Sequence, residues 1–79
     1  MAIYTYDAEA DALQVQLLDE SNMSIEQTVE LGPNLHVDLD AVGRVIGVEF
    51  LYPRTHGMDV GLVRERYGVD LTIPFSFAA

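Results

Sequence analysis

The sequence contains no cysteine, so it can form neither disulfide bonds nor thiolate metal sites. It also contains no lysine: four arginines stand against 13 aspartates and glutamates, and the formal net charge is −9 at pH 7. Such an acidic chain repels the phosphate backbone of nucleic acids. We therefore expect no nucleic-acid binding, and we expect a basic protein or cations to be the favoured kinds of partner.

Long apolar runs are absent as well. No stretch approaches the roughly 18 residues of a membrane span. Residues 1–4 begin neither a basic region nor an apolar signal core. These absences predict a cytoplasmic protein with no membrane attachment. The hydrophobic content of 49% argues against a disordered chain.

Signatures of two common enzyme classes are missing too. The serines lie outside any Gly-x-Ser-x-Gly context, which argues against a serine hydrolase, and no glycine-rich phosphate loop is present. No repeat, low-complexity segment or linker divides the 79 residues, so we expect a single domain over residues 1–79. We also expect no cofactor.

What the sequence does contain is alternation of apolar and polar residues. It predicts five successive strands, at residues 3–6, 13–17, 25–31, 35–40 and 44–51. The connections between them are short, which favours an antiparallel meander. A helix over residues 8–18 is the alternative, because alanine and glutamate are good helix formers. The alternation of Leu13, Val15 and Leu17 with glutamines favours the strand.

The turn at residues 40–44 gives the clearest local signal. Asp40 opens it and Gly43 closes it, between two alternating runs. Aspartate accepts backbone N–H groups in turns, and glycine adopts the positive φ that closes a hairpin with a bulge. Gly47 interrupts the following strand, which predicts a second bulge or the close approach of another element.

The rest of the chain breaks with this pattern. Residues 52–57 interrupt the alternation, and residues 58–67 then suit a short helix. Asp59 is placed to begin that helix and Gly68 to end it. Residues 69–77 fit an extended tail. The predicted fold class is therefore α+β: a five-stranded antiparallel meander sheet followed by a short helix and an extended C-terminal tail.

Alternation with a period of two also sorts the side chains of the sheet into two faces. The apolar face is expected to consist of Leu13, Val15, Leu17, Leu35, Val37, Leu39, Ile46, Val48 and Phe50. The polar face is expected to consist of Gln14, Gln16, His36, Asp38, Asp40 and Glu49. An antiparallel sheet can leave such a polar face in water.

The apolar face needs a cover, and a helix over residues 58–67 is too small to cover five strands. A chain of this length is also marginally stable alone. We therefore expect a homodimer; the alternative is a monomer whose tail folds back over its own sheet. Aromatic side chains concentrate in interface cores. The expected interface residues are Leu62, Val63, Tyr67, Leu71, Ile73, Phe75 and Phe77.

Two motifs resemble those of a known family. The run YDAEADAL at residues 6–13 resembles the opening signature Y-D-x-x-A-D-A-L of the DUF2283 family of small bacterial proteins. The runs VDLD at residues 37–40 and GRVIGVE at residues 43–49 match the second half of that pattern. The resemblance covers residues 3–51. The chain departs from the family at Gln14 and Gln16, where an aromatic and a basic residue are more usual.

The resemblance implies a compact antiparallel β-domain and carries no catalytic residues over, because the function of the family is unknown. Some members are encoded beside small toxin-like proteins, which implies an antitoxin-like or other binding role. The segment after Tyr52 lies outside the resemblance, so its role can be particular to this chain.

Three acidic residues, Asp7, Glu9 and Asp11, have the spacing of an oxygen-ligand cation loop. A calcium hand would also need glycine at its sixth position and glutamate at its twelfth, where this chain has Ala12 and Leu18. A structural turn, in which the aspartates accept backbone N–H groups, is therefore the favoured interpretation.

His36, Asp38 and Glu49 form the other candidate site. His36 and Asp38 are two residues apart on one predicted strand, and Glu49 is expected across from them. A histidine beside carboxylates can act as a general base or bind a divalent ion. A cross-strand ionic cluster without function is the alternative. His56 and Arg54 lie in a predicted loop, where a solvated connector is the simpler interpretation.

Two functions follow as hypotheses. The first is a non-enzymatic protein-binding or dimerisation module, based on small size, acidic charge and a one-sided sheet. The second is a small metal-binding protein or hydrolase-type enzyme that uses His36, Asp38 and Glu49. The sequence favours the binding module.

Overall fold

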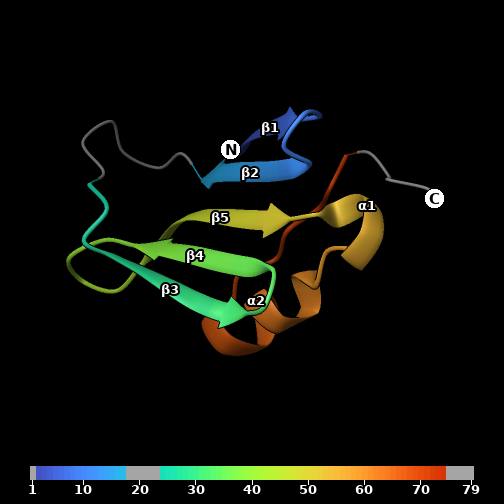
Figure 1. Ribbon diagram of the computed structural model, residues 1–79. Coiled ribbons are helices and arrows are strands. Elements are labelled where there is room, and N and C mark those ends of the chain that lie inside the picture. Colours follow the sequence, from blue (N-terminus) through green and yellow to red (C-terminus); the bar gives the residue numbers. More distant parts are fainter. Residues whose placement is uncertain (1, 18–23, 75–79) are drawn as a thin grey trace.

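The computed structural model describes residues 2–17 and 24–74. A five-stranded antiparallel sheet is followed by helices, which confirms the predicted α+β fold (Figure 1). The elements are β1 (Ala2–Asp7), β2 (Ala12–Leu17), β3 (Gln27–Gly32), β4 (Leu35–Leu39), β5 (Val45–Leu51), α1 (Pro53–His56) and α2 (Val60–Tyr67). The alternative helix at residues 8–18 is wrong, because β2 occupies most of that range.

The strand order is β1-β2-β5-β4-β3, which differs from the sequential order of a simple meander. The hairpin of β1 and β2 and the three-stranded unit of β3, β4 and β5 join along β2 and β5, where Val15 lies opposite Val48. Burial explains this order: β5 is mostly buried and lies at the centre, whereas the largely exposed β3 lies at an edge.

The turn between β4 and β5 forms as predicted. Oδ1 of Asp40 accepts hydrogen bonds from the backbone N–H groups of Val42 at 3.0 Å and Arg44 at 2.8 Å. Oδ2 of Asp40 accepts from Nε of Arg44 at 2.8 Å. Gly43 has a φ of +85°, in the left-handed region that glycine favours.

A bulge in β5 changes which residues face the core. Asp38 lies opposite Gly47, but Leu39 lies opposite Val45, so Ile46 has no partner in the β4 register. Val45 packs against the core, and Ile46 is buried and also lines a hollow together with Gln14 and Gln16. The bulge therefore brings Val45, which alternation left off the apolar face, into contact with the core, and Ile46 is buried as expected.

The helical segment begins earlier than expected. The short helix α1 was not predicted; it follows Tyr52, whose φ of +56° turns the chain sharply after β5. The N–H of Tyr52 donates to the carbonyl of Asp11 at 2.7 Å, which ties this corner to the turn between β1 and β2. No helix of the described residues has the length and apolar character needed to cross a bilayer.

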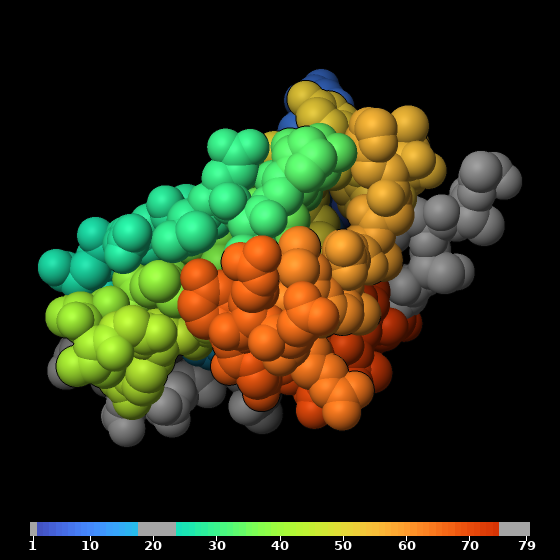
Figure 2. Space-filling view, turned by 90° about the horizontal axis from the view of Figure 1, so that it is seen from below, coloured from blue at the N-terminus to red at the C-terminus, as the bar shows by residue number. Residues whose placement is uncertain are grey.

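The predicted helix corresponds to α2, and both of its ends form as expected. Oδ1 of Asp59 accepts from the N–H of Leu62 at 3.0 Å, and Gly68 ends the helix with a φ of +70°. The space-filling view from below shows α2 against β3 and β4 (Figure 2).

The core lies between the sheet and a layer made of α2 and the segment that follows it. The buried cluster consists of Leu13, Val15, Leu35, Val48, Phe50 and Val63. Val69, Leu71 and Ile73 pack against this cluster, so residues 69–74 add to the cover that α2 alone cannot provide. We call the covered side of the sheet the inner face and the opposite side the outer face.

Candidate functional site

The outer face of the sheet holds the candidate cluster found in the sequence. His36 on β4 lies opposite Glu49 on β5, as expected, and Nδ1 of His36 is 3.9 Å from Oε1 of Glu49. Both side chains are partly exposed, at 29% and 43%. An open His–carboxylate pair of this length is a surface ion pair when the histidine is protonated, and such pairs contribute little to stability.

Asp38 does not join that pair. Its Oδ1 accepts a hydrogen bond of 2.7 Å from Oγ1 of Thr28 on β3, which orients the carboxylate along the outer face. The described residues contain no group of three or more histidines, cysteines, aspartates or glutamates that could hold a metal ion. Among the described residues, His36, Asp38 and Glu49 therefore share a face without forming a metal-ligand geometry.

Asp38 instead borders a hollow of about 190 Å³ on the outer face. Two isoleucines, Ile25 and Ile46, and two glutamines, Gln14 and Gln16, are among the residues around it. The hollow is lined by Gln14, Gln16, Ile25, Asp38, Ile46 and Gly47. Gly47 leaves room beside Asp38, since a Cβ at residue 47 would lie 3.1 Å from Oδ2 of Asp38.

This hollow was not foreseen from the sequence. Ile25 was expected on a strand, whereas it precedes β3 and is 57% exposed. Gly47 was the signal that could have led to it. A bulge at that glycine was one of two stated alternatives, and the register shift beside Gly47 leaves Ile46 without a partner on β4.

The charges of the sheet are segregated onto the same face. The carboxylates of the described strands belong to Asp7, Glu30, Asp38 and Glu49, all at outward positions of the register. No arginine lies on any of these strands: Arg44 is in a turn, and Arg54, Arg64 and Arg66 are helical. His36 is thus the one basic side chain on the strands described.

The acidic turn between β1 and β2 is held by hydrogen bonds to its own aspartates. Oδ1 of Asp7 accepts from the N–H groups of Glu9 at 3.1 Å and Ala10 at 3.2 Å. Asp11 has a φ of +51°, and its Oδ1 accepts from the hydroxyl of Tyr6 at 2.6 Å, a bond that raises the pKa of that hydroxyl. The favoured interpretation, a turn rather than a cation loop, agrees with these bonds.

The residues expected at a dimer interface lie largely against the chain's own sheet. Val63 is fully buried, and Leu62, Leu71 and Ile73 pack around the core. Tyr67 is half-buried, and the anchors Phe75 and Phe77 lie outside the described residues. A role for these side chains between two copies stays a prediction.

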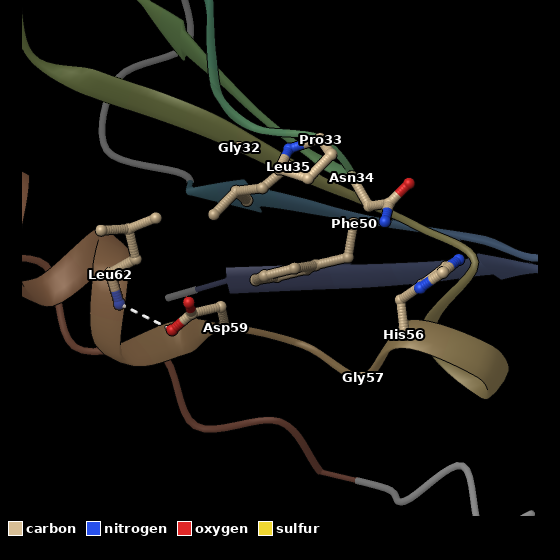
Figure 3. Close-up of a pocket in the computed structure, with 9 residues that line it drawn as sticks. All are labelled: Gly32, Pro33, Asn34, Leu35, Phe50, His56, Gly57, Asp59 and Leu62. Atoms are coloured by element: carbon tan, nitrogen blue, oxygen red, sulfur yellow. Dashed lines mark hydrogen bonds between the residues drawn. The ribbon is translucent and has the colours of Figure 1, made fainter.

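A second cavity, of about 200 Å³, lies on the inner face between the sheet and the helices (Figure 3). Leu35 and Leu62 lie toward one end, and Asn34 and His56 toward the other, with the ring of Phe50 between them. His56 was expected in a solvated connector; it is exposed, at the end of α1. None of the described polar or charged side chains is fully buried, so this cavity has no enclosed polar group to fix a ligand.

Comparison with known proteins identifies one family, and the residues that match it are those of the sheet. No curated protein and no solved structure matches the chain. The family described as "Protein of unknown function (DUF2283)" matches residues 3–52, which extend from β1 to the residue after β5. The signature residues have identifiable structural roles, since Tyr6 and Asp11 bond to each other and Gly43 closes the β4–β5 turn. The chain therefore belongs to the DUF2283 family, whose function is unknown.

Proposed function

We propose that this protein is a non-enzymatic binding module whose outer face receives a basic protein. The observation that carries the proposal is the hollow beside Asp38, in which a carboxylate, two glutamines and two isoleucines meet on the acidic face. A lysine or arginine side chain has matching chemistry: an apolar stem for Ile25 and Ile46, and a cationic end for Asp38.

The distribution of charge supports the same partner. A face with carboxylates and no arginine attracts a basic surface over a distance and accelerates encounter. An antitoxin-like role is one form of this function, in which the basic partner is a small toxic protein. The alternative, a metal-binding protein or a hydrolase that uses His36, Asp38 and Glu49, has less support because Asp38 is bonded to Thr28.

The test is a titration of isotopically labelled protein with a short arginine-rich peptide, followed by NMR. We expect amide shifts to concentrate on the residues that line the hollow, and the Asp38→Asn variant to bind about fivefold more weakly. Fivefold corresponds to about 1 kcal/mol, the upper range for one exposed charge pair.

The matched control is Glu65→Gln, which removes the same charge from an exposed position of α2. We expect this variant to bind like the wild type. Equal weakening by both variants would show that net charge alone attracts the peptide, and shifts on α2 rather than on the outer face would contradict the proposal. Added NaCl should weaken the binding.

A further inference from the structure

The strand β1 forms an open edge of the sheet. It is hydrogen-bonded to β2 and to no other strand of the described residues (Figure 1). All six of its residues pair with β2 in an unbroken register, so the strand has no bulge. Ile3, on its outer side, is 45% exposed, and Thr5 is exposed as well. A regular, exposed edge of this kind is a template for pairing with another strand.

The opposite edge, β3, is protected. Its register shifts between Glu30 and Gly32, and Pro33 follows directly, where it can donate no hydrogen bond. Natural sheets protect their edges with bulges, charges and prolines. The strand β1 has none of these before its last residue, Asp7, and it is rich in strand formers. The contrast singles out β1 as the edge suited to pairing.

The charge of the chain and of β1 determines which kind of strand can pair with this edge. The chain carries a net charge of −9, so two copies repel each other wherever their acidic residues meet. The strand β1 carries one charged residue, Asp7, at its end. An antiparallel pair of β1 strands centred on Tyr4 separates the two Asp7 residues by six positions, or about 20 Å at about 3.4 Å per residue. This exceeds the Debye length of about 8 Å at physiological salt.

We propose that β1 pairs antiparallel with β1 of a second copy, about a twofold axis perpendicular to the sheet. Such an axis keeps equivalent faces on one side, so outward residues must lie opposite outward residues. Pairing centred on Tyr4 meets this condition and places Ile3 opposite Thr5 of the second copy. The two sheets then form one ten-stranded sheet, whose remaining edges are the two protected β3 strands. Assembly therefore stops at the dimer.

This interface differs from the one expected in the sequence analysis, whose residues lie between 62 and 77, and it leaves the core between the sheet and α2 intact. It also places both outer faces on the same side of the dimer. The inference does not depend on the proposed function, because its tests use the purified protein without any peptide or partner.

The first test measures molar mass by light scattering after size-exclusion chromatography. The wild type should have twice the mass of the 8.8 kDa chain, and the Ile3→Lys/Thr5→Lys variant should have the mass of one chain. The matched control, Ile25→Lys/Gln27→Lys, places the same charges at exposed positions near the other edge and should stay dimeric. A monomeric wild type, or equal loss of the dimer in both variants, would overturn the proposal.

The second test remains valid if the lysine variant fails to fold. Because the chain lacks cysteine, single cysteines report contacts without background. A mixture of Ile3→Cys and Thr5→Cys chains should form a disulfide-linked dimer under mild oxidation, and Gln27→Cys should not. A covalent dimer of Thr5→Cys chains alone would also support pairing, in a register shifted by two residues. Failure of every β1 combination, or equal linking through residue 27, would contradict it.

Discussion

At the scale of single residues, Asp40 shows how one side chain fixes a turn. Its two carboxylate oxygens accept from Val42 and Arg44, and the backbone N–H of Arg44 is the largest influence that lowers the pKa of Asp40 below its ordinary value. Because the pKa is lower in the folded chain than in the unfolded chain, the carboxylate stabilises the fold above the unfolded pKa. That contribution is lost as the pH falls through the folded pKa.

The Asp40→Asn variant should therefore be less stable than the wild type at pH 7. As the pH falls below about 4, the ordinary aspartate value of the unfolded chain, and through the lowered pKa of Asp40 in the folded chain, the difference between the two proteins should shrink. Urea unfolding of both proteins between pH 7 and pH 3 measures this difference in the free energy of unfolding. A difference that stays constant over this range would contradict the assigned role of the Asp40 charge.

Gly47 is a second residue whose identity follows from its surroundings. A Cβ at this position would lie 3.1 Å from Oδ2 of Asp38 and 3.6 Å from the carbonyl oxygen of Val15. Because Thr28 anchors Asp38, we expect Gly47→Ala to destabilise the protein by about 1 kcal/mol or more in urea unfolding. Removal of the Asp38 side chain should relieve part of this cost in a double-mutant cycle.

Gly61 provides the matched control for that substitution. A Cβ there meets Oδ1 of Asp59 at 3.7 Å, an ordinary contact, inside the helix α2. Gly61→Ala should therefore stabilise the protein by about 0.5–1 kcal/mol, since alanine favours helix over glycine. If both alanine variants lost stability equally, the close approach at Gly47 would not be the cause.

At the scale of elements, α2 depends on Asp59, the residue that caps its N-terminus. It has eight residues, too few for a stable isolated helix. Asp59→Ala removes the acceptor of the Leu62 N–H and should lower the free energy of unfolding by about 1 kcal/mol. Asp59→Ser, which retains a capping oxygen, should recover most of the loss. Thermal and urea unfolding measure both variants, and equal losses would show that the cap is unimportant.

The elements also show what local sequence can predict. Alternation and turn chemistry placed β4, β5 and the turn at Asp40, and capping residues placed α2, because these signals act over a few residues. The helix α1 was missed because it depends on the positive φ of Tyr52, which no residue preference indicates. The contact of Val45 with the core was missed because it depends on the register with β4.

At the scale of the whole molecule, the pairing of β2 with β5 could not be derived from the strands themselves, since either order gives an apolar inner face. The same limit applies to the candidate site: contacts set by one turn could be predicted, and contacts that combine several strands could not. The opposition of His36 and Glu49 was predictable, because the β4–β5 turn sets their register. The hydrogen bond from Thr28 to Asp38 and the hollow were not, because both combine several strands.

The net charge of −9 makes a prediction for the molecule as a whole. Carboxylates collect on the outer face, so their mutual repulsion opposes the folded state more than the expanded one. Salt screens this repulsion: the Debye length falls from about 30 Å at 0.01 M to about 3 Å at 1 M. The melting temperature should therefore rise as NaCl is added.

At low salt, the Glu30→Gln/Glu49→Gln variant should melt at a higher temperature than the wild type, and this difference in melting temperature should disappear at 1 M NaCl. A melting temperature that falls with NaCl would mean that ion pairs such as Arg64–Asp70 outweigh the repulsion.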